Sequence, residues 1–228
     1  MPTELINRQK KKTLRSVPFY DLSMKEKYRL HDIKTIGYLD IETSGLTADF
    51  DIMLSYSVLI RDTQTEEIKI KSGVLKHSDF EYARQKGDAD LIDKLLVTDL
   101  IRDIKDIDLL IGHWFIGKHR HDIPFIRTRC AINHIPGFPH YRKVRYGDTQ
   151  KWGSTLYRLH NNGLDSIASM FDVHVKKTRL EPKMWKNACI GVKKALDYVL
   201  DHNIKDVKIT HKIHRGMEEW VPIPATYW

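Results

Sequence analysis

The sequence predicts a mixed α/β fold, a single sheet with helices on its faces. Strand-like segments follow one another at the start of the chain, and helix-like and strand-like segments alternate after them. That order is typical of a mixed sheet covered by helices. The chain has 228 residues and is 41% hydrophobic, which is enough for one domain with a sizeable core.

Three early segments are rich in β-branched and apolar residues. They are residues 34–41 (KTIGYLDI), 51–62 (DIMLSYSVLIRD) and 66–75 (EEIKIKSGVL). The first is what a central strand requires, and the polar turn RDTQTE joins the other two. We therefore expect three consecutive strands.

Helical and strand patterns alternate in the rest of the chain. Apolar residues recur at helical spacing from about 88 to 105, and a short apolar strand follows at 106–113. Pro124 in the first turn and Asp122 near the N-cap predict a helix over 122–133. The remaining expected elements are an edge strand over 141–149, a short helix over 163–173, and one or two helices over 191–220.

The chain divides into a basic N-terminal arm, residues 1–33, a folded domain, residues 34–220, and a C-terminal tail, residues 221–228. We expect the arm to pack partly on the domain, and it either contacts nucleic acid or is solvated. The tail is rich in proline and aromatic residues. It docks either on the domain or on a partner.

Charge and cysteine content limit the functional classes. Lys and Arg number 38 against 30 Asp and Glu, a net charge of +8. This balance suits a polyanionic partner, although solubility alone would also explain it. Two cysteines without paired spacing indicate reduced thiols and a cytoplasmic protein, and zinc-finger spacing is lacking. The sequence has no apolar run of membrane-spanning length and no signal-peptide pattern.

Two acids, Asp40 and Glu42, stand at the end of the first predicted strand. Residues two apart on a strand project from the same face, so these carboxylates repel each other unless a cation compensates. Magnesium and manganese prefer such oxygen ligands. Alternatively, the strand ends here and both acids are solvated.

Two further features favour a cation site. Asp122 begins a predicted helix shortly after a buried strand, and Asp206 follows His202 by four residues on a late helix. Side chains four apart share a helix face, so imidazole and carboxylate can point into one site. Taken alone, such a pair is more often a surface contact, so the combination carries the argument.

Three segments resemble the motifs of the DEDD superfamily of 3′→5′ exonucleases. They are YLDIETSGL, GHWFIGKHRHDIPFI and HNIKDV, in the order of that superfamily. The resemblance covers about residues 34–220. The segments YGDT, RLHNNGLDSIASMFDV and KKTRLEPKMWKNACIG also fit a branch of predicted phage and prokaryotic exonucleases. A phage-encoded member would act in the host cytoplasm.

This resemblance implies a ribonuclease-H-like fold, a mixed five-stranded sheet flanked by helices. It implies that Asp40, Glu42, Asp122 and Asp206 hold two Mg²⁺ or Mn²⁺ ions. One ion would activate the attacking water, and the other would stabilise the departing 3′ oxygen. The product would be a nucleoside 5′-monophosphate. Asp148, in YGDT, is expected to end a strand near the site without being a ligand.

The third motif departs from the superfamily pattern. One class has Tyr four residues before the aspartate, and another has His five residues before it. This chain has His202 at the first spacing and Asp201 at the second. We assign His202 as the general base, because an imidazole titrates near neutral pH. Alternatively, His202 is a structural substitution and activity is slow or lost.

Five residues are expected to contact substrate. Trp114 either stacks on a terminal base or packs in the core. Lys118 and Arg120 lie beside the proposed metal ligand Asp122, where they contact phosphate or form a solvated basic loop. Lys177 lies in a loop between helices and is placed to grip the substrate backbone. Thr43 directly follows Glu42.

The sequence therefore predicts a metal-dependent 3′→5′ exonuclease acting on single-stranded nucleic acid or frayed ends. DNA is favoured as substrate, although RNA stays open because no motif reads the 2′-hydroxyl. One alternative is a ribonuclease-H-like endonuclease, which would share Asp40 and the fold. Another is a non-catalytic nucleic-acid-binding module with a decayed site, although the presence of all four acids argues against decay.

Overall fold

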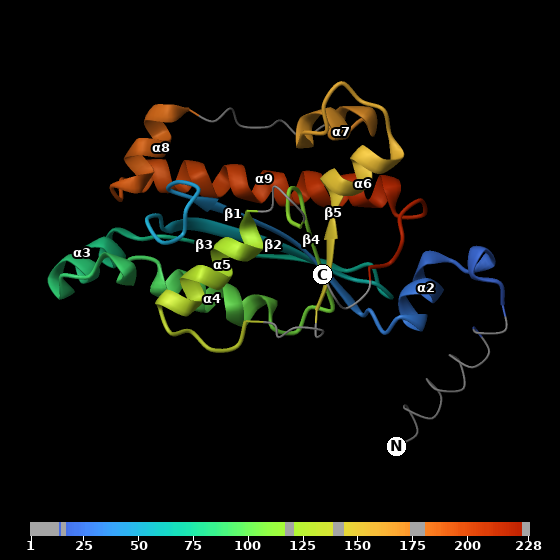
Figure 1. Ribbon diagram of the computed structural model, residues 1–228, viewed down its shortest axis with the longest axis horizontal. Coiled ribbons are helices and arrows are strands. Elements are labelled where there is room, and N and C mark those ends of the chain that lie inside the picture. The colour runs from blue at the N-terminus through green and yellow to red at the C-terminus, as the bar shows by residue number, and fades with distance from the viewer. Residues whose placement is uncertain (1–13, 15–16, 117–120, 139–143, 174–180, 225–228) are drawn as a thin grey trace, which may run out of the picture.

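A mixed five-stranded sheet forms the centre of the computed structural model (Figure 1). The structure describes residues 14, 17–116, 121–138, 144–173 and 181–224. The strands are β1 (Thr35–Thr43), β2 (Met53–Asp62), β3 (Ile68–Val74), β4 (Leu109–Gly112) and β5 (Arg145–Asp148). Their spatial order is β3-β2-β1-β4-β5, with the first two pairings antiparallel and the last two parallel. The predicted fold class is confirmed.

Strand β1 is the central strand that the sequence predicts. Leu39 and Ile41 belong to the larger apolar cluster, whereas Ile36 and Tyr38 belong to a second cluster. This division follows the alternation of side chains across a strand. Both faces of β1 are thus covered, and its even-numbered residues share one face.

Eight α-helices are present in the described residues, and helices lie on both faces of the sheet (Figure 1). Helices α4 and α5 pack on one face, and α9 crosses the other. The long C-terminal pattern forms one helix of 25 residues rather than two. The helices are α2 (Met24–Leu30), α3 (His77–Lys86), α4 (Lys94–Ile104), α5 (Asp122–Ile132), α6 (Thr149–Leu156), α7 (Leu164–Met170), α8 (Pro182–Cys189) and α9 (Lys193–Met217), with single turns η1 (Phe19–Asp21) and η2 (Ala89–Leu91).

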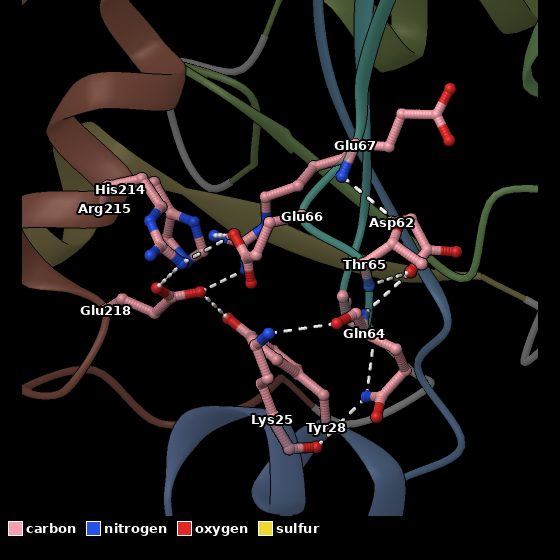
Figure 2. Close-up of polar contacts among 12 residues, drawn as sticks. Lys25, Tyr28, Asp62, Gln64, Thr65, Glu66, Glu67, His214, Arg215 and Glu218 are labelled. Atoms are coloured by element: carbon pink, nitrogen blue, oxygen red, sulfur yellow. Dashed lines mark hydrogen bonds and ion pairs between the residues drawn. The ribbon is translucent and has the colours of Figure 1, made fainter.

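A buried polar cluster ties the N-terminal helix α2 to the sheet and to the end of α9 (Figure 2). The hydroxyl of Tyr28 donates to Glu218 Oε1 at 2.6 Å, and Arg61 forms an ion pair with the same oxygen. Arg215 Nη1 lies 2.6 Å from Glu218 Oε2. Since Tyr28 is 2% exposed and Arg61 is 1% exposed, these contacts lie inside the domain. Helix α2 is therefore packed on the domain.

None of the helices in the described residues is both long and apolar enough to cross a membrane.

His214 connects this end of α9 to the central strand. Its Nδ1 lies 2.8 Å from the hydroxyl of Tyr38 on β1, and its side chain is buried. Burial lowers the pKa of His214 to about 3 and the pKa of its neighbour His211 to about 4. Both histidines are therefore neutral in the folded protein near pH 7.

We predict that the free energy of unfolding falls as the pH drops from 7 to 5. A histidine whose pKa is lowered by folding binds its proton more weakly in the native state, so acid favours the unfolded chain below about pH 6.5. For His214 the loss between pH 7 and 5 is about 2 kcal/mol. Urea unfolding of wild type and of His214→Gln at both pH values would measure it.

The variant should lose that part of the pH dependence. His77, which is exposed on α3, provides the matched control variant His77→Gln, and it should behave as wild type. An identical difference between pH 7 and pH 5 in wild type and in His214→Gln would contradict the assignment.

Candidate nuclease active site

The two acids of the first motif project from the α9-facing side of β1. Asp40 and Glu42 occupy strand positions two apart, and each meets a side chain of α9. Strand register against β2 shifts between Glu42 and Thr43, so the regular strand ends directly after the second acid. The predicted common face of the two carboxylates is present in the structure.

His202 on α9 joins the first and third motifs. Its Nε2 lies 3.9 Å from Glu42 Oε1 and 3.6 Å from Asp206 Oδ2. The imidazole is 3% exposed, and its Nδ1 has no hydrogen-bond partner among the described residues. Two carboxylates from distant parts of the sequence thus face one imidazole nitrogen.

Asp201, which stands five residues before Asp206, does not face the acids. Its side chain is 55% exposed and forms an ion pair with Lys205 on the helix surface. Consecutive helix positions are about 100° apart, and the rotation of α9 turns position 202 toward β1 and position 201 toward solvent. The structure places His202, and not Asp201, beside the acids.

Asn203 is a site residue that the sequence did not reveal. Its Nδ2 donates to Asp40 Oδ2 at 2.6 Å, and the residue is fully buried. The contact joins positions 163 residues apart, so no local pattern signals it. The signal that could have indicated it is a polar residue, Asn203, on the buried face of a helix that is otherwise mostly apolar.

The loop after β4 is fixed by Asp148. One oxygen of this carboxylate accepts hydrogen bonds from the backbone N–H groups of Phe115 at 2.7 Å and Ile116 at 2.9 Å. The other oxygen caps α6 by accepting from Gln150 N at 2.9 Å. Asp148 ends β5, as predicted, and anchors the loop that leads toward α5.

The start of α5 lies close to the end of β1. His121 directly precedes the helix, and its Nε2 is 3.3 Å from the hydroxyl oxygen of Thr43. Thr43 directly follows Glu42, and Asp122 directly follows His121. The second motif therefore lies beside the first, and the contact is made by the residues next to Glu42 and Asp122.

Asp122 is an acid held away from water. It is 6% exposed, and its Oδ2 has no hydrogen-bond partner among the described residues. Burial, and next the neighbouring Asp148 carboxylate, raise the pKa of Asp122 well above its usual value. A buried carboxylate oxygen without a hydrogen-bond donor is destabilising unless a proton or a cation compensates the charge.

The expected substrate contacts lie partly within the described residues. The hydroxyl of Thr43 donates to Gly45 O at 2.6 Å, which closes the turn after β1. Trp114 is 40% exposed and has a φ of 58°, a backbone conformation that is unusual for a bulky residue. Its indole is therefore accessible rather than buried in the core. Lys118, Arg120 and Lys177 lie outside the described residues.

The donor chemistry of the acids fits a hard divalent cation. Asp40, Glu42, Asp122 and Asp206 offer only carboxylate oxygens, which Mg²⁺ and Mn²⁺ prefer. In the described parts of the chain, no three His, Cys, Asp or Glu side chains form a complete metal-binding group. Magnesium commonly takes one or two carboxylates together with water and substrate phosphate, so it does not require three protein ligands.

Comparison with known proteins agrees with this architecture. A family model of the RNase H superfamily matches residues 37–217, which include most of β1, the second motif and all of α9. No curated protein matches the chain. RNase H-like proteins include nucleases that act on nucleic acid and generally use divalent metal ions. The match covers most of the chain, which therefore belongs to the RNase H superfamily.

Proposed function

We propose that this protein is a metal-dependent 3′→5′ exonuclease that releases nucleoside 5′-monophosphates from single-stranded or frayed nucleic acid, with DNA favoured. The observation that carries the proposal is the approach of Glu42 and Asp206 to His202 Nε2 across the contact between β1 and α9. The order of the three motifs along the chain supports cleavage at an end rather than internally.

The four acids have one role in this proposal. Asp40, Glu42, Asp122 and Asp206 hold two Mg²⁺ or Mn²⁺ ions through carboxylate oxygens. When bound, such ions activate water and stabilise the charge on the departing 3′ oxygen. The unpartnered, buried Oδ2 of Asp122 supports this role, because a cation would compensate its charge.

His202 acts on the attacking water. Its Nε2 faces the two carboxylates, so a water held by them lies within reach of the imidazole. A neutral imidazole accepts a proton at Nε2 or orients the water by accepting its hydrogen bond. Trp114, in the second motif, is exposed, and its indole offers a flat face on which a terminal base stacks without sequence preference.

The proposal predicts digestion from the 3′ end. We expect 5′-labelled single-stranded DNA, incubated with Mn²⁺, to give a ladder that shortens from the 3′ end. Asp206→Asn should abolish the ladder because it removes a ligand charge while keeping the side-chain shape. Asp201→Asn, on the exposed face of the same helix, provides the matched control and should cleave as wild type.

Different products would point to other functions. Internal fragments in place of a ladder would identify an endonuclease. Retained binding of DNA and of RNA, without cleavage of either, would identify a binding module. Either result would overturn the proposed exonuclease.

The assignment of His202 predicts a catalytic defect without loss of metal. We expect His202→Asn to lower kcat by about 10²–10⁴, the range for a missing general base. Binding of Mn²⁺, measured by calorimetry, should stay within a few-fold of wild type. His160→Asn, at an exposed histidine before α7, serves as control. A kcat within threefold of wild type in His202→Asn would refute the assignment.

The assignment of Asp122 predicts a conflict between activity and stability. Asp122→Asn should lose most activity, yet its melting temperature at pH 8 without metal should rise by about 3–6 °C, because a neutral amide replaces a carboxyl group whose charged form is destabilised by burial. Differential scanning calorimetry would measure the change, with exposed Asp106→Asn as control. A lower melting temperature in Asp122→Asn would show that the ionised side chain stabilises the fold.

A further inference from the structure

Asn203 contacts a proposed metal ligand without being one itself. It lies on α9 directly after His202, and its Nδ2 donates to Asp40 Oδ2 at 2.6 Å. The residue is completely buried, so no water competes for the amide. This is a short hydrogen bond between a neutral donor and a carboxylate, a class stronger than a bond between neutral groups.

The orientation of this amide is fixed by its partner. An ionised carboxylate only accepts hydrogen bonds, so the NH₂ group of Asn203 must face Asp40. The opposite end of the amide, Oδ1, is buried without a hydrogen-bond partner among the described residues. Such a buried carbonyl is unfavourable for folding, and an apolar side chain of similar size would avoid it.

We infer that Asn203 is a positioning residue, which fixes one oxygen of Asp40 and so holds this carboxylate in the orientation that binds a divalent cation. The inference rests on the proposed function, because it concerns the same acids. A ligand that must be held to a fraction of an ångström requires a rigid neighbour. Partners that hydrogen-bond to metal ligands commonly change metal affinity by 10–100-fold.

A second asparagine in the chain makes the same contact in a structural setting. Asn133, at the end of α5, donates from Nδ2 to Asp93 Oδ1 at 3.2 Å and is also buried. Asp93 additionally accepts hydrogen bonds from Arg129 and from the backbone of Met53, which joins α4, α5 and β2. Asn133 is therefore the matched control, an amide bound to a buried acid outside the proposed site.

The test compares Mn²⁺ binding by wild type, Asn203→Leu and Asn133→Leu in isothermal titration calorimetry. Leucine removes the donor and keeps the approximate volume. We expect Asn203→Leu to bind Mn²⁺ about tenfold more weakly, whereas Asn133→Leu should bind it as wild type does. In kinetic assays, added Mn²⁺ should restore much of the activity of Asn203→Leu, and KM for DNA should stay unchanged. Asn203→Ala repeats the test if the leucine variant does not fold.

The outcomes separate this inference from the proposed function. If wild type binds Mn²⁺ and cleaves DNA while Asn203→Leu binds Mn²⁺ equally or more tightly, Asn203 is not a positioning residue and the nuclease proposal stands. If Asn133→Leu weakened Mn²⁺ binding as much as Asn203→Leu does, the inference would also be overturned, because the loss would not depend on contact with Asp40. If wild type neither binds Mn²⁺ nor cleaves, the proposed function fails and this inference fails with it.

Discussion

The packing of α9 along β1 is the contact on which the site depends. Tyr38, Asp40 and Glu42 share one face of the strand, and each meets a polar side chain of the helix, namely His214, Asn203 and His202, respectively. As the strand advances from 38 to 42, its partners descend from 214 to 202, so the two elements run in opposite directions. Any slip of the helix would separate the acids of the first and third motifs.

The acids of this protein differ in the groups that surround them. Asp93 and Asp148 are buried but surrounded by donors, and their hydrogen bonds fix the positions of α4, α5 and the loop after β4. Glu42 and Asp206 instead lie against the same imidazole, and Asp122 has an oxygen that no described donor reaches. The structural acids therefore position the segments, while the others provide an arrangement that a divalent cation would stabilise.

The strands were predicted from the sequence more completely than the helices. The acids of the motifs were predicted, whereas the residue Asn203, which contacts one of them, was not. β1 could be predicted because its alternation and its two acids are local patterns, whereas α3 has only Ala83 buried and lacks a strong apolar face. The choice between Asp201 and His202 needed the helix rotation relative to β1, which no spacing gives. Asn203 was missed because its contact also depends on how α9 packs on β1. Its partner Asp40 lies 163 residues away in the sequence, so no local pattern indicates the contact.

Manganese-soaked crystals would test the central claim most directly, since anomalous scattering locates the ion without reference to activity. The account predicts anomalous peaks between the end of β1 and α9, within ligand distance of carboxylate oxygens of Asp40, Glu42 or Asp206, with a further contact to Asp122. Peaks confined to other parts of the molecule, or none at millimolar Mn²⁺ in crystals that leave this region open to solvent, would contradict it.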